Sequence, residues 1–164
     1  MKTSRREFIK VSGAAGAGLV LAFHLPSTTE ASKLANPQFA PNVWLRIDRD
    51  SKVTITCHKS EMGQGVRTSL PMMVAEELDV DFSKVVVEQA MADPKYGQQL
   101  TGGSTSVRTT MEKLRTAGAT ARAMLVAAAA KEWGVQPSAC HTEPGFVVGP
   151  AGKRAGYGAL AEAA

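Results

Sequence analysis

The chain has 164 residues, which leaves one domain of ordinary size once an N-terminal leader is set aside. Nineteen Lys and Arg residues against 15 Asp and Glu residues give a formal net charge of +4. Residues 31–164 hold 15 basic and 13 acidic side chains, a net charge of only +2, and aromatic residues make up 5% of the chain. So weak a positive charge and so few rings exclude the basic or base-stacking surface of a nucleic-acid-binding protein.

Residues 1–30 have the pattern of a twin-arginine export signal. Arg5 and Arg6 lie in the run Ser4–Lys10, and an uncharged stretch follows over residues 11–23. A basic start and a short apolar stretch are typical of export signals, and this stretch is too short to cross a bilayer. The alternative is an ordinary secretory signal that happens to hold two arginines. We expect the folded protein to be exported to the periplasm.

The next segments predict a linker and then a β-hairpin. Residues 31–41 read as a linker because Pro37 and Pro41 stand among small and polar residues without periodicity. Apolar residues then alternate over 43–47 and again over 52–58, on either side of a polar turn. Such alternation predicts two half-buried strands. One face of the hairpin would carry Val43, Leu45, Ile47, Val53, Ile55 and Cys57.

Helices and strands then alternate with glycine-rich loops. Spacings of three and four predict a helix from about Ser69 to Asp79, with Ser69 as the N-cap. Residues 84–90 have the composition of a strand, and a long helix is predicted over 107–133. Gly134 is the expected C-cap of that helix. Its apolar face is small in the middle, which predicts close approach of another backbone; the face comprises Met111, Leu114, Gly118, Ala121, Leu125 and Ala128.

The last thirty residues predict a strand pair around Phe146–Val148 and the opening turns of a helix over 157–164. The chain ends inside that helix, which indicates a fragment or a truncated product. Together the elements predict an α+β fold, with a mixed or antiparallel sheet and helices packed on one of its faces.

Two loops share one design, and each is expected to precede a helix. They are Gly63–Ser69 and Thr101–Arg108, both rich in glycine and hydroxyl groups. Free N–H groups at a helix start bind anions, and glycine lets a ligand approach the backbone. Taken alone, each loop is better explained by a simple capped turn. The two together favour an anionic ligand, although neither has the spacing of a known phosphate-binding motif.

Other candidate residues carry weaker signals. Cys57 and Cys140 lack the spacing of iron–sulfur ligands, and we expect small buried residues rather than a disulfide. His58 and His141 have no partners at ligand spacing, so no metal site held by side chains is expected. Glu61 borders the first loop and reads as a solvated surface acid, with polar lining of the site as the alternative.

The motif residues resemble a known family. Glu61–Thr68, with the sequence EMGQGVRT, is similar to the E-M-G-Q-G-x-x-T loop of molybdenum-binding large subunits of the xanthine dehydrogenase family. The run Thr101–Arg108, followed by Leu114–Ala119, resembles the branch of isoquinoline 1-oxidoreductase beta subunits and related periplasmic aldehyde dehydrogenases. The resemblance covers nearly the whole chain, and residues 42–164 would be the N-terminal part of a molybdopterin-binding domain.

The resemblance implies a cofactor, a reaction and partners. Such subunits bind molybdopterin cytosine dinucleotide with molybdenum. They oxidise an aldehyde or hydroxylate an N-heterocycle with oxygen from water. Electrons leave through a small subunit with two [2Fe–2S] clusters, often toward a c-type cytochrome; no iron–sulfur cluster is expected in this chain. The residues implied in cofactor binding are Gly63, Gln64, Gly65, Thr68, Gly102, Gly103, Ser104, Thr105, Ser106 and Arg108.

The chain departs from this family in length. Family subunits are several times longer, and their catalytic glutamate lies near the C-terminus, so no catalytic and no metal-ligating residue is predicted here. The first hypothesis is therefore a piece of a periplasmic molybdenum hydroxylase, inactive alone. The alternatives are a short exported module that binds a pyrophosphate-containing ligand without catalysis, or a non-functional remnant.

Overall fold

The computed structural model describes residues 39–164, with side chains from Asn42 onward. The predicted export signal over 1–30 and residues 31–38 of the predicted linker lie outside the described residues.

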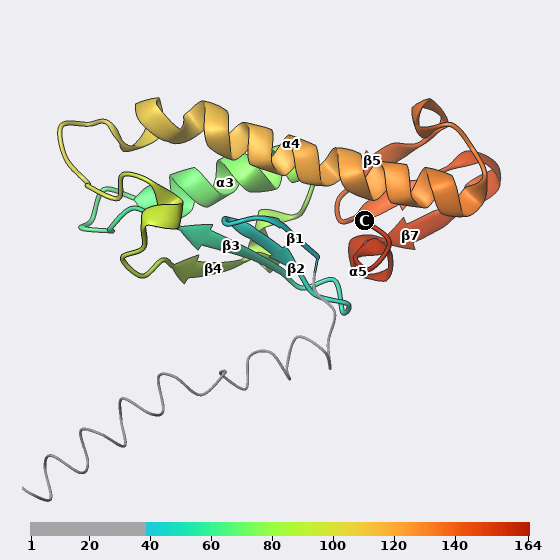
Figure 1. The fold of residues 1–164 in the computed structure, drawn as a ribbon, viewed down its shortest axis with the longest axis horizontal. Helices are drawn as coiled ribbons and strands as arrows, with labels where there is room; N and C mark the ends of the chain where they lie inside the picture. Colours follow the sequence, from blue (N-terminus) through green and yellow to red (C-terminus); the bar gives the residue numbers. More distant parts are fainter. Residues whose placement is uncertain (1–38) are drawn as a thin grey trace, which may run out of the picture. The chain divides into compact units, whose positions relative to one another are not determined.

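A four-stranded sheet forms the first half of the described fold (Figure 1). Its strands are β1 (Phe39–Asn42), β2 (Leu45–Ile47), β3 (Val53–Cys57) and β4 (Val86–Gln89), in the order β1-β2-β3-β4. The predicted hairpin is confirmed for β2 and β3, which pair antiparallel with Ile47 opposite Val53. The prediction is wrong for Val43, which lies in the turn before β2 and is exposed. β4 pairs parallel with β3, so the sheet is mixed. A mixed sheet was one of the two arrangements predicted from the sequence, the other being fully antiparallel.

Strand β1 corrects the predicted end of the linker. Residues 39–41 belong to this edge strand and pair with β2, rather than continuing the linker. The register shifts between Phe39 and Asn42, which removes the alternation that would have revealed a strand. Pro41 is tolerated here because an edge strand has N–H groups that need no partner.

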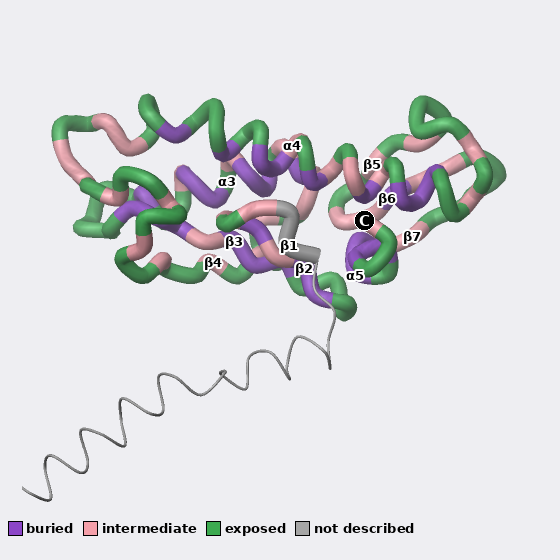
Figure 2. Tube along the Cα trace, in the orientation of Figure 1, coloured by how far each residue is buried: buried purple, intermediate pink, exposed green. Residues whose placement is uncertain are grey.

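Two helices cover one face of this sheet, as predicted (Figure 1). They are α3 (Val66–Leu78) and α4 (Ser106–Trp133), and they pack on each other. Figure 2 shows the buried residues of α4 as a stripe along its length. At the centre of that stripe, a Cβ on Gly118 would lie 2.4 Å from the carbonyl oxygen of Val74 in α3. The predicted close approach of two backbones is therefore confirmed.

Helix boundaries agree with prediction for α4 and differ for α3. The α4 C-cap is Gly134, in the left-handed conformation (φ 68°), as expected. Helix α3 starts at Val66 instead of Ser69, with Gly65 (φ 78°) at the N-cap. Pro71 consequently lies inside the helix. If Ser69 were the N-cap, Pro71 would lie in the first turn instead.

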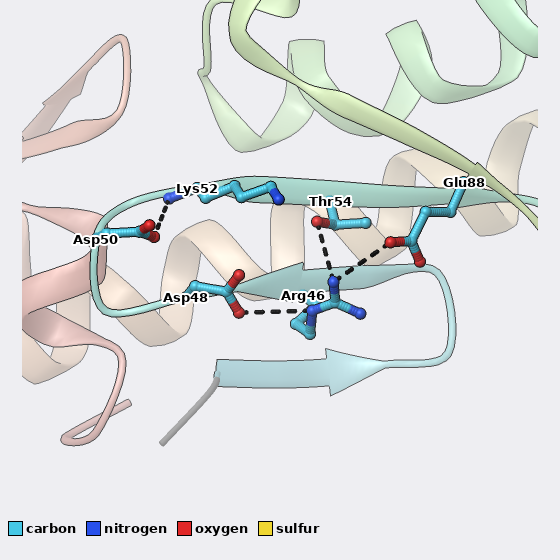
Figure 3. Close-up of polar contacts among 6 residues, drawn as sticks. All are labelled: Arg46, Asp48, Asp50, Lys52, Thr54 and Glu88. Carbon is cyan, nitrogen blue, oxygen red and sulfur yellow. Dashed lines mark hydrogen bonds and ion pairs between the residues drawn. The ribbon is translucent and has the colours of Figure 1, made fainter. Parts of the chain in front are cut away.

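The other face of the sheet carries a polar network drawn in Figure 3. The Arg46 guanidinium donates to Thr54 Oγ1 (3.3 Å) and Glu88 (3.4 Å), and its Nε lies 3.5 Å from Asp48. Side chains alternate along a strand, so Arg46 points away from the helices while Leu45 and Ile47 are buried beneath them. The network joins β2, β3 and β4 across their polar face.

A second, antiparallel sheet follows α4. It consists of β5 (His141–Glu143), β6 (Phe146–Val148) and β7 (Arg154–Gly156), one strand more than predicted, and leads into α5 (Tyr157–Leu160). Tyr157, the first residue of α5, is fully buried and donates its hydroxyl to the carbonyl oxygen of Leu78 (2.8 Å), which links α5 to the end of α3. Short 3-10 turns cover Phe82–Lys84, Pro94–Tyr96, Pro137–Ala139 and Pro150–Gly152. Within residues 39–164, no helix is both long and apolar enough to cross a membrane.

Candidate functional site

The two predicted loops meet at one cavity. It has a volume of about 420 Å³ and lies between the starts of α3 and α4. Residues from both loops line it, and none of them is acidic or basic: Met62, Gln64, Val66, Ser69, Thr101, Gly102, Gly103, Ser104, Ser106 and Val107. The convergence of segments almost forty residues apart follows from the parallel pairing of β3 and β4, whose carboxyl ends lie at the same edge of the sheet.

The second loop turns sharply into α4 and leaves the helix start open. Gly103 and Ser104 both take left-handed backbone angles (φ 59° and 54°), and the Thr105 hydroxyl donates to the carbonyl oxygen of Gly102 (2.8 Å). The N–H groups of Ser106, Val107 and Arg108 donate to no residue that the structure describes. Three free donors at the positive end of a helix dipole favour an anion.

A buried lysine holds the second loop against the first. Lys59 is 1% exposed, and its ammonium donates to the carbonyl oxygens of Gln98 (2.5 Å) and Leu100 (3.0 Å). Its burial lowers the pKa of the ammonium. The Thr101 hydroxyl adds a bond to the carbonyl oxygen of Ser60 (3.1 Å). These contacts fix the wall of the cavity that the second loop supplies.

The first loop places an acceptor of its own at the start of α3. The Glu61 carboxylate accepts from the N–H groups of Gly63 (2.8 Å), Gly65 (3.0 Å) and Arg67 (3.0 Å). These bonds, the one from Arg67 foremost, hold the pKa of Glu61 below its usual value. The Gln64 side chain also folds back within the loop, donating to Ser60 O and accepting from Met62 N–H. The Glu61 carboxylate thus takes the position that an external anion could occupy in this loop. This role is more specific than that of the solvated surface acid expected from the sequence.

The predicted site residues divide between the cavity wall and its support. Gln64, Gly102, Gly103, Ser104 and Ser106 line the cavity. Gly63 and Gly65 instead hold Glu61, and Thr105 braces the turn before α4. Thr68 lies in the first turn of α3 with its N–H bonded to Gly65 O, and Arg108 is exposed without a described partner.

Sequence reasoning did not single out the apolar part of the wall. Met62, Val66 and Val107 line the cavity beside the hydroxyls of Ser69 and Thr101. Val66 and Ser69 lie three residues apart in α3 and share one helical face, which is a usable signal once the helix is known to begin at Val66. The late start predicted for α3 hid that signal.

The remaining candidates have structural positions. Cys57 is buried as expected and Cys140 is half-buried, and both thiols are free. Burial raises the pKa of Cys57. His58 is buried, which lowers its pKa, with the positive charges of Lys59 and Lys113 acting in the same direction. Within the described part of the chain, no three His, Cys, Asp or Glu side chains gather as a metal site.

Comparison with known proteins identifies the family. The family model described as "Molybdopterin cofactor-binding domain" matches residues 2–164. The chain belongs to this family. The resemblance stated from the loop motifs is therefore confirmed, and the converging glycine loops are a feature of a molybdopterin cofactor-binding domain.

Curated relatives are larger oxidoreductases. A membrane-bound aldehyde dehydrogenase [pyrroloquinoline-quinone] of Gluconacetobacter polyoxogenes is 35% identical over 94% of this chain and 20% of its own length. Isoquinoline 1-oxidoreductase subunit beta of Brevundimonas diminuta is 38% identical over 98% of this chain and 22% of its own length. This chain thus spans about a fifth of the length of the relatives it matches.

Solved structures share the fold. Quinoline 2-oxidoreductase from Pseudomonas putida 86 superposes with a TM-score of 0.58 and 24% identity, over 73% of this chain and 15% of that one. A CO dehydrogenase from Oligotropha carboxidovorans superposes with a TM-score of 0.57 and 16% identity, over 93% of this chain and 22% of that one. These likenesses establish the α+β fold as one that large oxidoreductases contain.

Proposed function

We propose that this chain supplies one wall of the cofactor site in a periplasmic molybdenum hydroxylase that oxidises an aldehyde or an N-heterocycle. The observation that carries the proposal is the loop cavity, where the open start of α4 meets the glycines and hydroxyls of both loops. The names of the relatives, an aldehyde dehydrogenase and an isoquinoline oxidoreductase, support the substrate class.

The cavity residues fit a pyrophosphate. Ser106, Val107 and Arg108 offer their free N–H groups, and the hydroxyls of Ser104 and Ser106 line the same space. A Cβ on Gly102 would meet no atom within 4 Å, so this glycine leaves open space where a ligand can contact the backbone. No carboxylate lines the cavity to repel phosphate oxygens.

We assign different tasks to the two loops. The second loop would hold the pyrophosphate of molybdopterin cytosine dinucleotide, because its helix start is open. The first loop, whose N–H groups are occupied by Glu61, would shape the cavity through Met62, Gln64 and Val66. When bound, the cofactor supplies the two-electron redox chemistry that transfers an oxygen derived from water to the substrate. The residues of this chain bind and orient it.

The partners and the location belong to the same proposal. The word "subunit" in the name of the Brevundimonas diminuta relative supports assembly with other chains, which would include a small [2Fe–2S] subunit and a c-type cytochrome as electron acceptor. The twin-arginine pattern of residues 1–30 supports export to the periplasm. Replacing Arg5 and Arg6 by Lys should retain the protein in the cytoplasmic fraction, and unchanged export would contradict this route.

Cofactor capture tests the proposal directly. The chain is purified from a host that makes the dinucleotide cofactor, and nucleotides released by acid are quantified. We expect CMP in near-equimolar amount, and an at least tenfold loss of CMP in Gly102→Val. Because a Cβ at Gly102 meets no atom within 4 Å and Gly102 lines the cavity, the added side chain should block the ligand while thermal unfolding stays unchanged.

Thr120→Val, on the exposed face of α4, is the matched control and should retain CMP. Release of a different nucleotide in equal amount would contradict the cytosine form. Absence of nucleotide from the folded wild-type chain would contradict the cofactor-binding role.

A further inference from the structure

A second cavity lies beside the first turns of α4, further along the helix than the loop cavity. Its volume is about 330 Å³, and it shares no lining residue with the loop cavity. Its wall comes from the turn between β1 and β2, the residue after β3, the segment from the 3-10 turn Pro94–Tyr96 to Gln98, and the first turns of α4. The lining residues are Trp44, His58, Pro94, Lys95, Tyr96, Gly97, Gln98, Thr109, Thr110, Lys113 and Leu114. Three of these are basic or titrate as bases, and none is acidic.

Two buried polar atoms in this lining have no hydrogen-bond partner among the described residues. They are Nε1 of Trp44 and Nδ1 of His58. His58 is only 3% exposed, and the two rings lie 6.2 Å apart between centroids beside the same cavity. Native proteins rarely leave two buried polar atoms without partners so close together. Both atoms therefore mark a place where a ligand contributes acceptors.

The charges around the cavity select an anion. The Lys113 ammonium forms no ion pair with any residue in the described range, whereas Lys95 pairs with Asp93 (3.0 Å). Lys59 follows His58 in the chain and adds a further positive charge nearby. Burial together with Lys59 and Lys113 lowers the pKa of His58, so the imidazole is neutral at pH 7 and its Nδ1 donates in the tautomer that carries the proton there.

The rest of the lining is apolar enough for an organic tail. Pro94, Leu114 and the rings of Trp44 and Tyr96 provide apolar surface beside the donors. Two ring N–H groups and one ammonium match the two oxygens of a carboxylate, and the apolar walls match a hydrocarbon group. A bare inorganic anion would leave that apolar surface without contacts.

We propose that this cavity binds a small organic carboxylate. Trp44 Nε1 and His58 Nδ1 donate to its two oxygens, Lys113 neutralises its charge, and Leu114 and Tyr96 pack against its tail. The site is independent of the proposed cofactor site, since the two cavities have no lining residue in common.

Titration of the full chain with sodium benzoate, followed by NMR of side-chain N–H and imidazole resonances at pH 7, tests this site. We expect saturable shifts of the Trp44 indole N–H and of the His58 imidazole resonances. Trp133, the other tryptophan, does not line this cavity and its indole N–H serves as the internal control. Equal shifts at both indoles, or no saturable shift, would overturn the proposal.

Variants separate this site from its surroundings. Lys113→Met should weaken benzoate binding about three- to tenfold, whereas Lys131→Met, on the same helix and outside the cavity, should leave it unchanged. His58→Gln should abolish the Trp44 shift while pyrophosphate binding at the loop cavity persists. Inorganic phosphate is the comparison ligand: saturable binding of phosphate without binding of benzoate or acetate would overturn the assignment to a carboxylate.

Discussion

The two loop–helix junctions have similar sequences and opposite electrostatic states. At the start of α3, a carboxylate from the chain itself, Glu61, accepts from three backbone N–H groups. At the start of α4, the first-turn N–H groups of Ser106, Val107 and Arg108 have no acceptor in the described structure. One junction is therefore closed by its own anion, and the other is open to an external one.

This difference shows what a glycine-rich loop does and does not indicate. Glycines and hydroxyls before a helix predict accessible N–H groups, but an acid a few residues upstream decides whether those groups are free. The second loop has Leu100 and Thr101 where the first has Ser60 and Glu61, so no carboxylate reaches back to α4. The position of nearby acids should be read together with the glycines.

The largest expected effect comes from breaking the packing that sets the two junctions side by side. In Gly118→Ala the added Cβ would lie 2.4 Å from Val74 O, which forces α3 and α4 apart. We expect a loss of about 2–3 kcal/mol in the free energy of unfolding, measured by urea denaturation. Thr120→Ala on the exposed face should change it by less than about 0.5 kcal/mol. Equal stability of Gly118→Ala and wild type would show that the helices are not in backbone contact.

Removing the Glu61 carboxylate should leave free backbone N–H groups at the start of α3, as at the start of α4. Glu61→Ala frees the N–H groups of Gly63, Gly65 and Arg67, so a second pyrophosphate should bind at the start of α3. Calorimetric titration should then give two sites per chain instead of one. A Glu162→Ala variant, which removes an exposed acid far along the chain, is the control and should retain one site. A single site in Glu61→Ala would mean that the α3 junction has no latent affinity for anions.

The pH dependence of stability should report the same carboxylate. Backbone N–H groups hold the pKa of Glu61 below its unfolded value of 4.5, so its stabilising effect is complete above that pH and is lost as the pH falls further. The difference in melting temperature between wild type and Glu61→Gln should therefore be constant from pH 6 to 7 and shrink below about pH 4.5. A difference independent of pH down to pH 3 would contradict a charged cap.

The smallest effect is expected at Arg108. Its side chain is exposed and does not line the loop cavity, so it adds only a screened attraction for a bound anion. Arg108→Gln should weaken pyrophosphate binding by about two- to threefold at low salt, with no difference at high salt. A tenfold loss that persists in high salt would place the guanidinium in direct contact with the ligand.

Sequence patterns located the elements that have strong periodicity. The β2–β3 hairpin and the long helix α4 with its Gly134 cap were predicted because alternation and helical spacing are local properties. The edge strand β1 was wrongly assigned to a linker because a register shift and Pro41 erase its alternation. The start of α3 was placed too late because its cap is a left-handed glycine supported by a carboxylate from outside the helix.

The candidate site was predictable only where a local sequence pattern marks it. The second loop was identified from consecutive glycines and hydroxyls before a helix. The apolar wall of Met62 and Val66, and the pairing of Trp44 with His58, depend on which segments the fold brings together. Such juxtapositions follow from topology, above all from the parallel pairing of β3 and β4, which no local pattern encodes.

The most direct test of the account is a pyrophosphate titration of the wild-type chain followed by amide NMR. The account predicts saturable shifts at the N–H groups of Ser106, Val107 and Arg108, with those of Gly63, Gly65 and Arg67 unmoved because Glu61 occupies them. Shifts centred on the α3 junction, or none at the α4 junction, would contradict the claim that the second loop is the anion-binding one.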